Sequence, residues 1–333
     1  MSPTLAKKRA YVGVLLGLVV GIVCTMVYRQ FFDVPVAGPG VLRQSHFRKN
    51  EYSYINPLLV LNPAESPLLQ PLKSNISHLI DQYKANNKAT NVSVYYKDLN
   101  NGRWFGLDTD EVYSPGSMLK VMTMIAYFKY AERDYSILSH KLYYDGVADQ
   151  NVQENLPSKH QITKGWYTVE DLISYMVKYS DNNAARLLNA HLNQIDPSFL
   201  NQPFLDLGLD TISTTDDYLT ISDYSLFFRV LYNSTYLSRE MSERALGIMT
   251  QTDFTKGISR DLPAGITVAQ KFGEFSIVDE TGNPLKRELH NCGIVYDKDA
   301  PYLLCVMTKG IAFPDLEDII AEISSTIYSS PRR

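Results

Sequence analysis

Residues 114–121 read Ser-Pro-Gly-Ser-Met-Leu-Lys-Val and lead into an apolar stretch, Met118–Ala131. The Pro-Gly pair before the second serine favours a turn, and the apolar run after it predicts a helix. Residues three apart share one face of a helix, so the Lys120 amine can reach the Ser117 hydroxyl. A serine hydroxyl is a poor nucleophile until a neighbouring base activates it. The stretch therefore predicts a nucleophile and its base, with a helix cap as the structural alternative for Ser117.

Two further short patterns follow: Ser180-Asp181-Asn182 between two predicted helices, and Lys271-Phe272-Gly273 on a predicted strand. Each is weak alone, but each of the three patterns occurs once in the chain. Burial and a neighbouring cation lower the pKa of a lysine, so Lys271 could make Lys120 a base near neutral pH. Ser180 is expected to relay a proton to the leaving nitrogen, and Lys271 to attract a substrate carboxylate. Asn182 is expected to bind a substrate carbonyl or to fix Lys120.

The oxyanion formed by attack on a carbonyl needs hydrogen-bond donors. The backbone N–H groups of Ser117, at a helix start, and of Glu274, on the strand that continues from Gly273, are the expected donors. If the hairpin turn centres near Gly282, His290 can face Glu274 across the hairpin and serve as an auxiliary residue. A surface polar contact is the structural alternative for that pair.

Hydrophobic periodicity places the remaining elements. A helix is expected near residues 72–83, strands at 92–96 and 104–107, and mostly helices between about 115 and 250. Strands return at 266–278, 288–296 and 301–308, and a helix at 316–328 follows. The fold class is therefore α+β: an antiparallel five-stranded sheet, completed by both ends of the domain and flanked by helices, with a separate all-helical lobe. A cleft between the two lobes is the expected place for the site.

Composition excludes several classes of protein. The 333 residues are 45% hydrophobic and 20% charged, which is typical of a globular chain. The net charge of −4 and the pI near 5.9 argue against a nucleic-acid partner. Three cysteines and six scattered histidines show no metal-ligand spacing, so we expect neither a metal nor another cofactor. Cys292 and Cys305 fall on adjacent predicted strands, and numbers alone favour free buried thiols over a disulfide there.

The amino-terminal region predicts a membrane anchor. Ala10 to Tyr28 are 19 uncharged residues, roughly 28 Å as a helix, which matches the hydrocarbon core of a bilayer. The basic residues 7–9 precede this segment, so the positive-inside rule puts the rest of the chain outside the cytoplasm. The expected organisation is a cytoplasmic tail at 1–9, a single-pass transmembrane anchor at 10–28, an extracytoplasmic spacer at 29–70 and a globular domain at 71–330. A cleaved signal peptide is the alternative.

The three patterns, in this order, resemble those of the class A β-lactamases and related penicillin-binding DD-peptidases. The resemblance covers roughly residues 72–328 and includes Tyr179-Ser180-Asp181-Asn182 and the helical sequence after it. It implies a β-lactamase/transpeptidase-like fold, an acyl-enzyme on Ser117, and a β-lactam or a D-Ala-D-Ala-like peptidoglycan amide as substrate. The class A branch looks most similar. A DD-peptidase or a catalytically silent cell-wall-binding module on the same fold is the alternative.

Two departures from the family pattern bear on turnover and on substrate. The glutamate that activates the deacylating water in class A enzymes, in a Glu-x-x-Leu-Asn setting, is missing between Ser180 and Lys271. Slow deacylation follows, with Asp216 or Asp217 as candidate substitutes. Phe272 replaces the usual Thr or Ser of the third motif, and strand alternation predicts that it faces away from the cleft. A carboxylate at Glu274 would disfavour a carboxylate-bearing substrate unless His290 or another cation neutralises it.

Overall fold

The computed structural model describes residues 64–148, 153–157, 160–209, 218–298 and 300–331. The predicted anchor at 10–28, the tail before it and nearly all of the spacer lie outside these ranges, as do Asp216 and Asp217. In the part of the chain that is described, no helix is both long and apolar enough to cross a bilayer.

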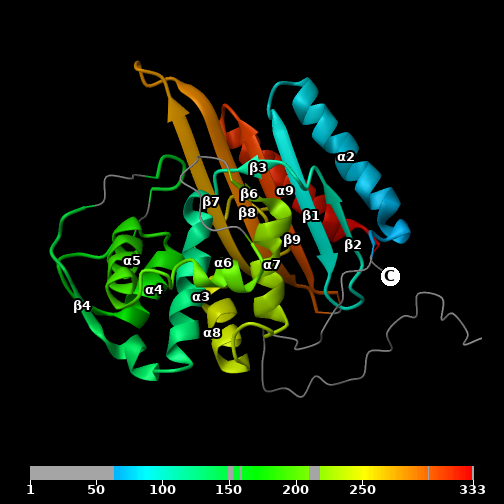
Figure 1. Ribbon diagram of the computed structural model, residues 1–333. Coiled ribbons are helices and arrows are strands. Elements are labelled where there is room, and N and C mark those ends of the chain that lie inside the picture. The colour runs from blue at the N-terminus through cyan, green and yellow to red at the C-terminus, as the bar shows by residue number, and fades with distance from the viewer. Residues whose placement is uncertain (1–63, 149–152, 158–159, 210–217, 299, 332–333) are drawn as a thin grey trace, which may run out of the picture. The chain divides into compact units, whose positions relative to one another are not determined.

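A five-stranded antiparallel sheet organises the domain, with the spatial order β2-β1-β9-β8-β7 (Figure 1). The strands are β1 (Asn91–Asp98), β2 (Trp104–Leu107), β7 (Thr267–Val278), β8 (Pro284–Tyr296) and β9 (Tyr302–Gly310). The first pair and the last three strands are far apart in sequence, yet β1 pairs with β9. The predicted sheet, completed by both ends of the domain, is confirmed.

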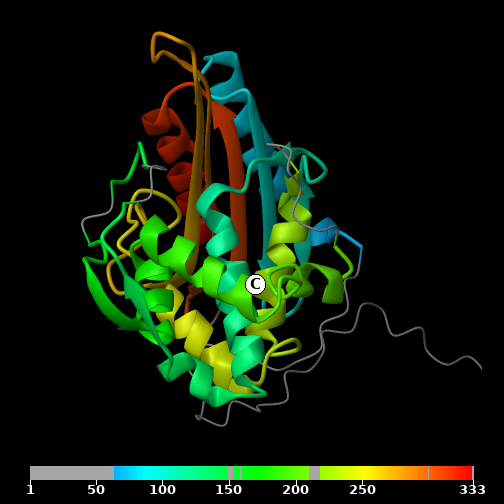
Figure 2. The same cartoon turned by 60° about the vertical axis from the view of Figure 1, so that its left-hand side comes forward.

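Two helices cover one face of the sheet: α2 (Gln70–Ala85) and α9 (Phe313–Ser329), which pack on each other (Figures 1 and 2). Each carries buried apolar residues at helical spacing, such as Ile76 and Ile80 in α2. Val94 and Val306, which are paired in the sheet, complete this apolar layer.

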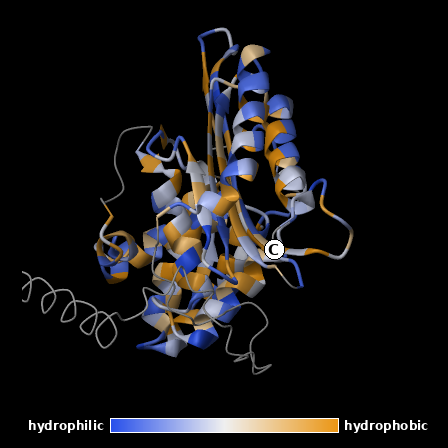
Figure 3. Cartoon of the chain, turned by 90° about the vertical axis from the view of Figure 1, so that its right-hand side faces the viewer, coloured by the Kyte–Doolittle hydropathy of each residue, from blue (hydrophilic) through white to orange (hydrophobic). Residues whose placement is uncertain are grey.

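The opposite face carries the helical lobe (Figure 1). Its helices are α3 (Lys120–Ala131), α4 (Val169–Lys178), α5 (Asn182–Ile195), α6 (Gln202–Asp206), α7 (Ile221–Tyr232) and α8 (Arg239–Met249). Helix α3 is almost entirely buried because other helices surround it. Hydrophobic and hydrophilic residues both occur along the helices around it (Figure 3), as expected for elements that bury one side.

Short elements complete the domain. Three 3-10 turns, η1 (Pro67–Leu69), η2 (Gly116–Leu119) and η3 (Tyr135–Ser139), and two small ladders were not predicted. The ladders pair β3 (Val112–Tyr113) with β6 (Leu219–Thr220), and β4 (Lys141–Tyr144) with β5 (Gly165–Thr168). Strands of two to four residues are too short to show an alternating pattern, which explains why the sequence does not reveal them.

The β7–β8 hairpin corrects one prediction. Its register pairs Gly273 with His290 and Glu274 with Leu289, so His290 does not face Glu274. The turn does lie at Gly282, which has a φ of +86°. The expected pairing is wrong by one residue, and a one-residue shift moves a side chain to the other face of a strand.

The cysteine pair corrects a second prediction. Cys292 on β8 lies directly opposite Cys305 on β9, and the two form a disulfide instead of remaining free thiols. Both residues are fully buried between the sheet and the helical lobe. Residues directly opposite each other on antiparallel strands have neighbouring Cβ atoms. The number of cysteines in the sequence does not reveal which residues are opposite each other, so the prediction missed this pair.

Candidate active site

Ser117 lies in the 3-10 turn η2, between the end of β3 and the start of α3. The turn is fixed by a hydrogen bond from the Met118 amide to the Pro115 carbonyl and by one from the Tyr224 hydroxyl to the Met118 carbonyl. Lys120 is the first residue of α3, so the predicted helix begins two residues later than expected. In a 3-10 turn, residues three apart are eclipsed, which places the Lys120 side chain beside that of Ser117.

The Lys120 amine is surrounded by oxygen atoms. Its Nζ lies 2.9 Å from the Ser117 Oγ, 3.0 Å from the Ser180 Oγ, 2.5 Å from the Ser180 carbonyl oxygen and 2.6 Å from the Asn182 Oδ1. The lysine is buried, with 7% of its surface exposed. The structure thus brings together the first two predicted patterns. Of the two roles expected for Asn182, holding Lys120 is the one seen here.

Ser180 links the second and third patterns. Its Oγ accepts hydrogen bonds from Lys120 Nζ and from Lys271 Nζ, each at 3.0 Å. Ser180 has a φ of +54°, a left-handed conformation that is costly for a residue other than glycine. Such strain persists where the surroundings impose it, often at functional sites. The hydroxyl is therefore held between two amines, as a proton relay requires.

Lys271 is fully buried behind Ser180. Its Nζ also donates to the Phe272 carbonyl oxygen at 2.9 Å. Burial, and next the neighbouring Lys120 ammonium, lower the pKa of Lys271 well below its ordinary value. The cation expected to contact a substrate carboxylate is thus enclosed and is not among the residues that line the cleft.

Asp181 has a structural role. It is the N-cap of α5, and its Oδ1 accepts hydrogen bonds from the amides of Asn183 and Ala184. Its Oδ2 accepts a third, from the Ile162 amide at 2.7 Å. The cap fixes the start of the helix that carries Asn182.

Two glycines allow the nucleophile turn to approach strand β7. A Cβ at Gly116 would lie 2.4 Å from the Glu274 carbonyl oxygen, and a Cβ at Gly273 would lie 2.5 Å from the Pro115 carbonyl oxygen. Both distances are shorter than any real contact, so only glycine fits at either position. The backbone of Glu274 therefore runs beside the turn that carries Ser117. This is the placement that the predicted pair of oxyanion donors, the amides of Ser117 and Glu274, requires.

The Glu274 side chain reaches across to another segment. Its Oε1 accepts hydrogen bonds from the amides of Glu154, at 2.5 Å, and Asn155, at 3.1 Å. Glu154 in turn accepts from Ser276 Oγ at 2.8 Å and pairs with Arg287. Burial is the main cause that raises the pKa of Glu274. The carboxylate thus joins the rim of the cleft to β7.

Residues 153–157 were not predicted to belong to the site. Gln153 donates from its Nε2 to the Ser180 carbonyl oxygen at 2.9 Å, and Gln153 and Glu154 line the cleft. This segment has no helix or strand and carries no motif. The sequence holds no local signal that would have revealed these contacts.

His290 lies beneath the nucleophile turn. It is fully buried, and its Nδ1 accepts from the Thr308 amide at 3.3 Å, which leaves Nε2–H to donate to the Ser114 carbonyl oxygen at 3.0 Å. The buried Glu288 accepts from the Ser114 amide at 2.9 Å. These two side chains hold both backbone groups of Ser114, three residues before the nucleophile. His290 therefore supports the site from below and does not contact Glu274.

The aromatic ring in the third pattern faces away from the cleft, as expected. Phe272 is fully buried on the α2 and α9 side of the sheet, where its ring stacks on that of Phe254 at a centroid distance of 4.2 Å. A hydroxyl at this position of the motif is thus replaced by a core residue.

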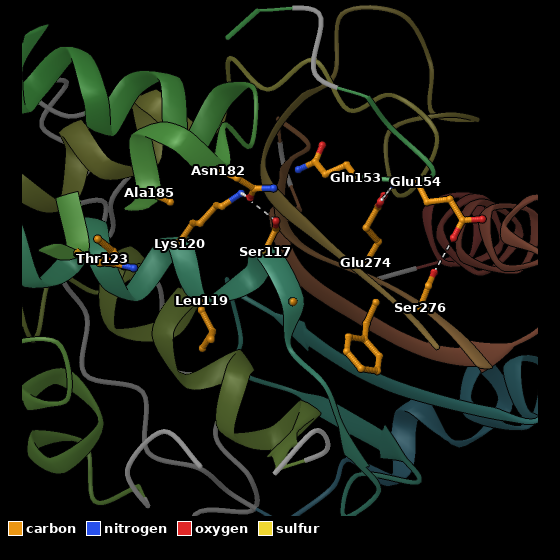
Figure 4. A pocket seen from close by; sticks show the side chains of 13 residues that line it. Ser117, Leu119, Lys120, Thr123, Gln153, Glu154, Asn182, Ala185, Glu274 and Ser276 are labelled. Atoms are coloured by element: carbon orange, nitrogen blue, oxygen red, sulfur yellow. Dashed lines mark hydrogen bonds between the residues drawn. The ribbon is translucent and has the colours of Figure 1, made fainter. Parts of the chain in front are cut away.

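A cavity of about 440 Å³ opens over these groups. Figure 4 shows Ser117, Lys120 and Asn182 on one side of it and Glu274 on the other, with Gln153 and Glu154 nearby. Among the described residues, no group of three or more His, Cys, Asp or Glu side chains could hold a metal ion. The arrangement can perform acyl transfer: the Ser117 hydroxyl and the Lys120 amine line the cleft, and the buried Ser180 hydroxyl and Lys271 amine continue the hydrogen-bonded chain behind them.

Comparison with known proteins agrees with this geometry. A model of a family described as "Beta-lactamase enzyme family" matches residues 71–330. Among solved structures, a PBP-A mutant, captured as an acyl-enzyme complex with penicillin G, is 21% identical with a TM-score of 0.65, over 80% of this chain and 97% of its own. The extended-spectrum β-lactamase TLA-1 is 18% identical, with a TM-score of 0.64 over 77% and 97% of the two chains. A β-lactamase from Chitinophaga pinensis is 19% identical, with a TM-score of 0.63 over 76% and 98%. No curated protein matches the chain.

Proposed function

The chain belongs to the β-lactamase enzyme family and is a serine hydrolase; from this premise we propose that it forms an acyl-enzyme on Ser117 with β-lactams or D-Ala-D-Ala-like amides. The observation that carries the proposal is the convergence of Ser117, Lys120, Ser180 and Lys271 through hydrogen bonds of 2.9 to 3.0 Å. The acyl-enzyme that PBP-A forms with penicillin G supports the same chemistry here.

The proposed acylation uses the residues in sequence. The Lys120 amine, once neutral, takes the proton from the Ser117 hydroxyl, and the oxygen attacks the carbonyl carbon. The amides of Ser117 and Glu274 donate to the developing oxyanion. The carbon–nitrogen bond then breaks, and the proton passes from Lys120 through the Ser180 hydroxyl to the leaving nitrogen. Lys271 orients Ser180 from behind and, when charged, favours the neutral form of Lys120.

Deacylation is proposed to be slow. Class A enzymes, which the chain resembles, carry a glutamate in a Glu-x-x-Leu-Asn sequence. No such sequence occurs here between Ser180 and Lys271. Without that carboxylate, water is not activated efficiently next to the ester. A slow β-lactamase and a DD-peptidase share the acylation step. They differ in the substrate that donates the acyl group, which is a β-lactam for the first and a D-Ala-D-Ala-like peptide for the second.

Labelling with a fluorescent penicillin tests the proposal. We expect a covalent label on the wild-type chain, none on Ser117→Ala, and a rate at least about a hundredfold lower for Lys120→Met. Following the label after removal of free drug separates trapping from hydrolysis. A wild-type chain that is labelled neither by penicillin nor by a neutral fluorophosphonate would favour a silent cell-wall-binding module instead.

We also propose that residues 10–28 anchor the chain in the cell membrane with the catalytic domain outside the cytoplasm. The hydrophobic length and the basic residues before it support this orientation. The disulfide between Cys292 and Cys305 is consistent with an oxidising compartment. Protease added to intact spheroplasts should digest the domain, and survival of the domain there would contradict the orientation.

A further inference from the structure

The charges around the cleft are unusual for a site that would hold a carboxylate. Among the described residues that line it, the charged ones are Lys120, Glu154 and Glu274. The Lys120 amine is directed at Ser117, Ser180 and Asn182. Glu154 is compensated by its ion pair with Arg287. Among the described residues, Glu274 has no ion-pair partner within 4.0 Å, and its attraction for the buried Lys271 is smaller than the effects of burial and of Lys120 on that lysine. The wall of the cleft that β7 forms is therefore negative.

The groups that the family resemblance implies for a substrate carboxylate cannot serve it here. Lys271 has no exposed surface, and its Nζ is bound to Ser180 Oγ and to the Phe272 carbonyl. At the next position, Phe272 directs its ring to the opposite face of the sheet. Going along β7, the next residues that line the cleft are Glu274, Phe275 and Ser276. A carboxylate of the substrate would therefore meet a carboxylate of the protein.

One oxygen of Glu274 is buried without a hydrogen-bond donor. Oε1 is used by the amides of Glu154 and Asn155, whereas Oε2 has no hydrogen-bond partner. Gln153, which also lines the cleft, has an unpartnered Oε1. Buried acceptors without partners are rare because each costs free energy. Both acceptors belong to residues that line the cleft, so a ligand that carries N–H donors fits this wall better than one that carries a carboxylate.

We propose that the cleft selects acyl donors that carry an ammonium or a neutral N–H donor, and not a carboxylate, on the part that lies along β7, with Glu274 making the selection. The substrate class is thus a lactam or peptide amide with an uncharged or cationic substituent next to the scissile carbon–nitrogen bond. This inference rests on the proposed acyl transfer at Ser117. In that step the Ser117 oxygen–carbon bond forms, the carbon–nitrogen bond breaks, and the serine proton ends on the leaving nitrogen.

Three penicillins that differ in charge at one position test the proposal on the full chain in detergent. They are the free carboxylate, its methylamide and its 2-aminoethyl amide, with charges of −1, 0 and +1. Acylation rate constants of Ser117 are normalised to each compound's alkaline hydrolysis. We expect the cationic compound to react about tenfold faster than the anionic one or more, with the neutral one between.

Glu274→Gln keeps the size of the side chain and an oxygen for the loop amides but removes the charge. We expect the three rate constants to converge within about threefold in this variant. A residue that only supported the loop would change all three rates alike, so the order of the rates isolates the charge. Glu280→Gln, an equal change of charge on the exposed β7–β8 turn, should leave the order unchanged.

The outcomes separate this inference from the proposed function. If an uncharged fluorophosphonate labels wild type and not Ser117→Ala, the nucleophile is established independently of substrate charge. If the three penicillins then react at equal rates, or if the anionic penicillin reacts fastest, selection by Glu274 is overturned and the proposed acyl transfer is not. Absence of labelling by the fluorophosphonate and by all three penicillins would overturn the proposed function itself.

Discussion

At the scale of single residues, the site depends on a fully buried lysine, Lys271, on which burial and Lys120 outweigh the opposing attraction of the Asp253 and Glu274 carboxylates. Lys271 is enclosed on all sides, and both burial and Lys120 lower its pKa. A charged amine in such a place loses its hydration, so the folded domain favours the neutral form. The same effect that prepares the site for proton transfer therefore lowers stability near neutral pH.

This gives a prediction for stability against pH. The unfolded Lys271 keeps its proton up to about pH 10.5, whereas the folded one loses it at lower pH. Between those two values the unfolded state binds more protons, so stability rises with pH, by up to about 1.4 kcal/mol per unit. Lys271→Met should be more stable than wild type at pH 7, with the difference shrinking towards pH 9. Urea unfolding at pH 7, 8 and 9 measures it.

Comparing Lys271→Met with the wild type removes the contribution of the other titratable groups, because both proteins contain them. Lys97, whose pKa burial lowers to about 8, contributes equally to both proteins. Lys141→Met, at an exposed position of β4, is the matched control and should follow the wild-type curve. Parallel curves for wild type and Lys271→Met would mean that Lys271 titrates as an ordinary lysine.

The residues that a motif names were predictable at this scale, and the others were not. The spacing of residues in the three motifs identifies Ser117, Lys120, Ser180 and Lys271. The structure brings these four side chains together. Glu288 could not be predicted, because its role is a contact with the Ser114 backbone 174 positions away. The error for His290 has the same origin: one residue of strand register decides its face.

At the scale of elements, the site depends on how closely turn η2 approaches strand β7. Gly116 has a φ of +51°, and its missing side chain leaves room for the Glu274 carbonyl. The sequence predicted strand β7 and a turn at Pro115-Gly116, though not the 3-10 form of η2, and the separation of the two elements follows from the absence of two side chains. Patterns of hydrophobic residues report which face is buried and say nothing about how near two backbones lie.

The Gly116→Ala variant tests whether acylation depends on the short distance between turn η2 and strand β7. The new methyl group must push β7 away, which moves the Glu274 amide from the nucleophile. We expect the acylation rate to fall by about a hundredfold, the typical loss when one oxyanion donor is removed. A cost of about 1–3 kcal/mol in stability accompanies it. Stopped-flow acylation and urea unfolding measure the two effects.

The Gly265→Ala variant is a control for backbone strain, because it places alanine at a positive φ without the steric clash that Gly116→Ala creates. Gly265 also has a positive φ, +90°, but a Cβ there would meet nothing within 4 Å. It should lose about 1 kcal/mol of stability and acylate at the wild-type rate. Equal acylation rates for the two variants would show that the close approach does not matter for the reaction.

At the scale of the whole molecule, strands from both ends of the domain form one sheet, and the helical lobe is inserted between them. The order of elements was enough to predict this, because strands at both ends that enclose helices can bury their apolar faces in one antiparallel sheet. The covalent link between β8 and β9 was missed, because it depends on the register that places Cys292 opposite Cys305. This link and the amino-terminal segment can be tested together.

Thiol counting is the test. We expect the chain purified from membranes and denatured without reductant to take one alkyl label, on Cys24, and three labels after reduction. A cleaved signal peptide would remove Cys24, so the unreduced chain would take none. Three labels without reduction would contradict the disulfide and the oxidising compartment that supports an external domain. The Cys292→Ser/Cys305→Ser variant should take one label under both conditions, because the proposed anchor would keep Cys24 within the mature chain.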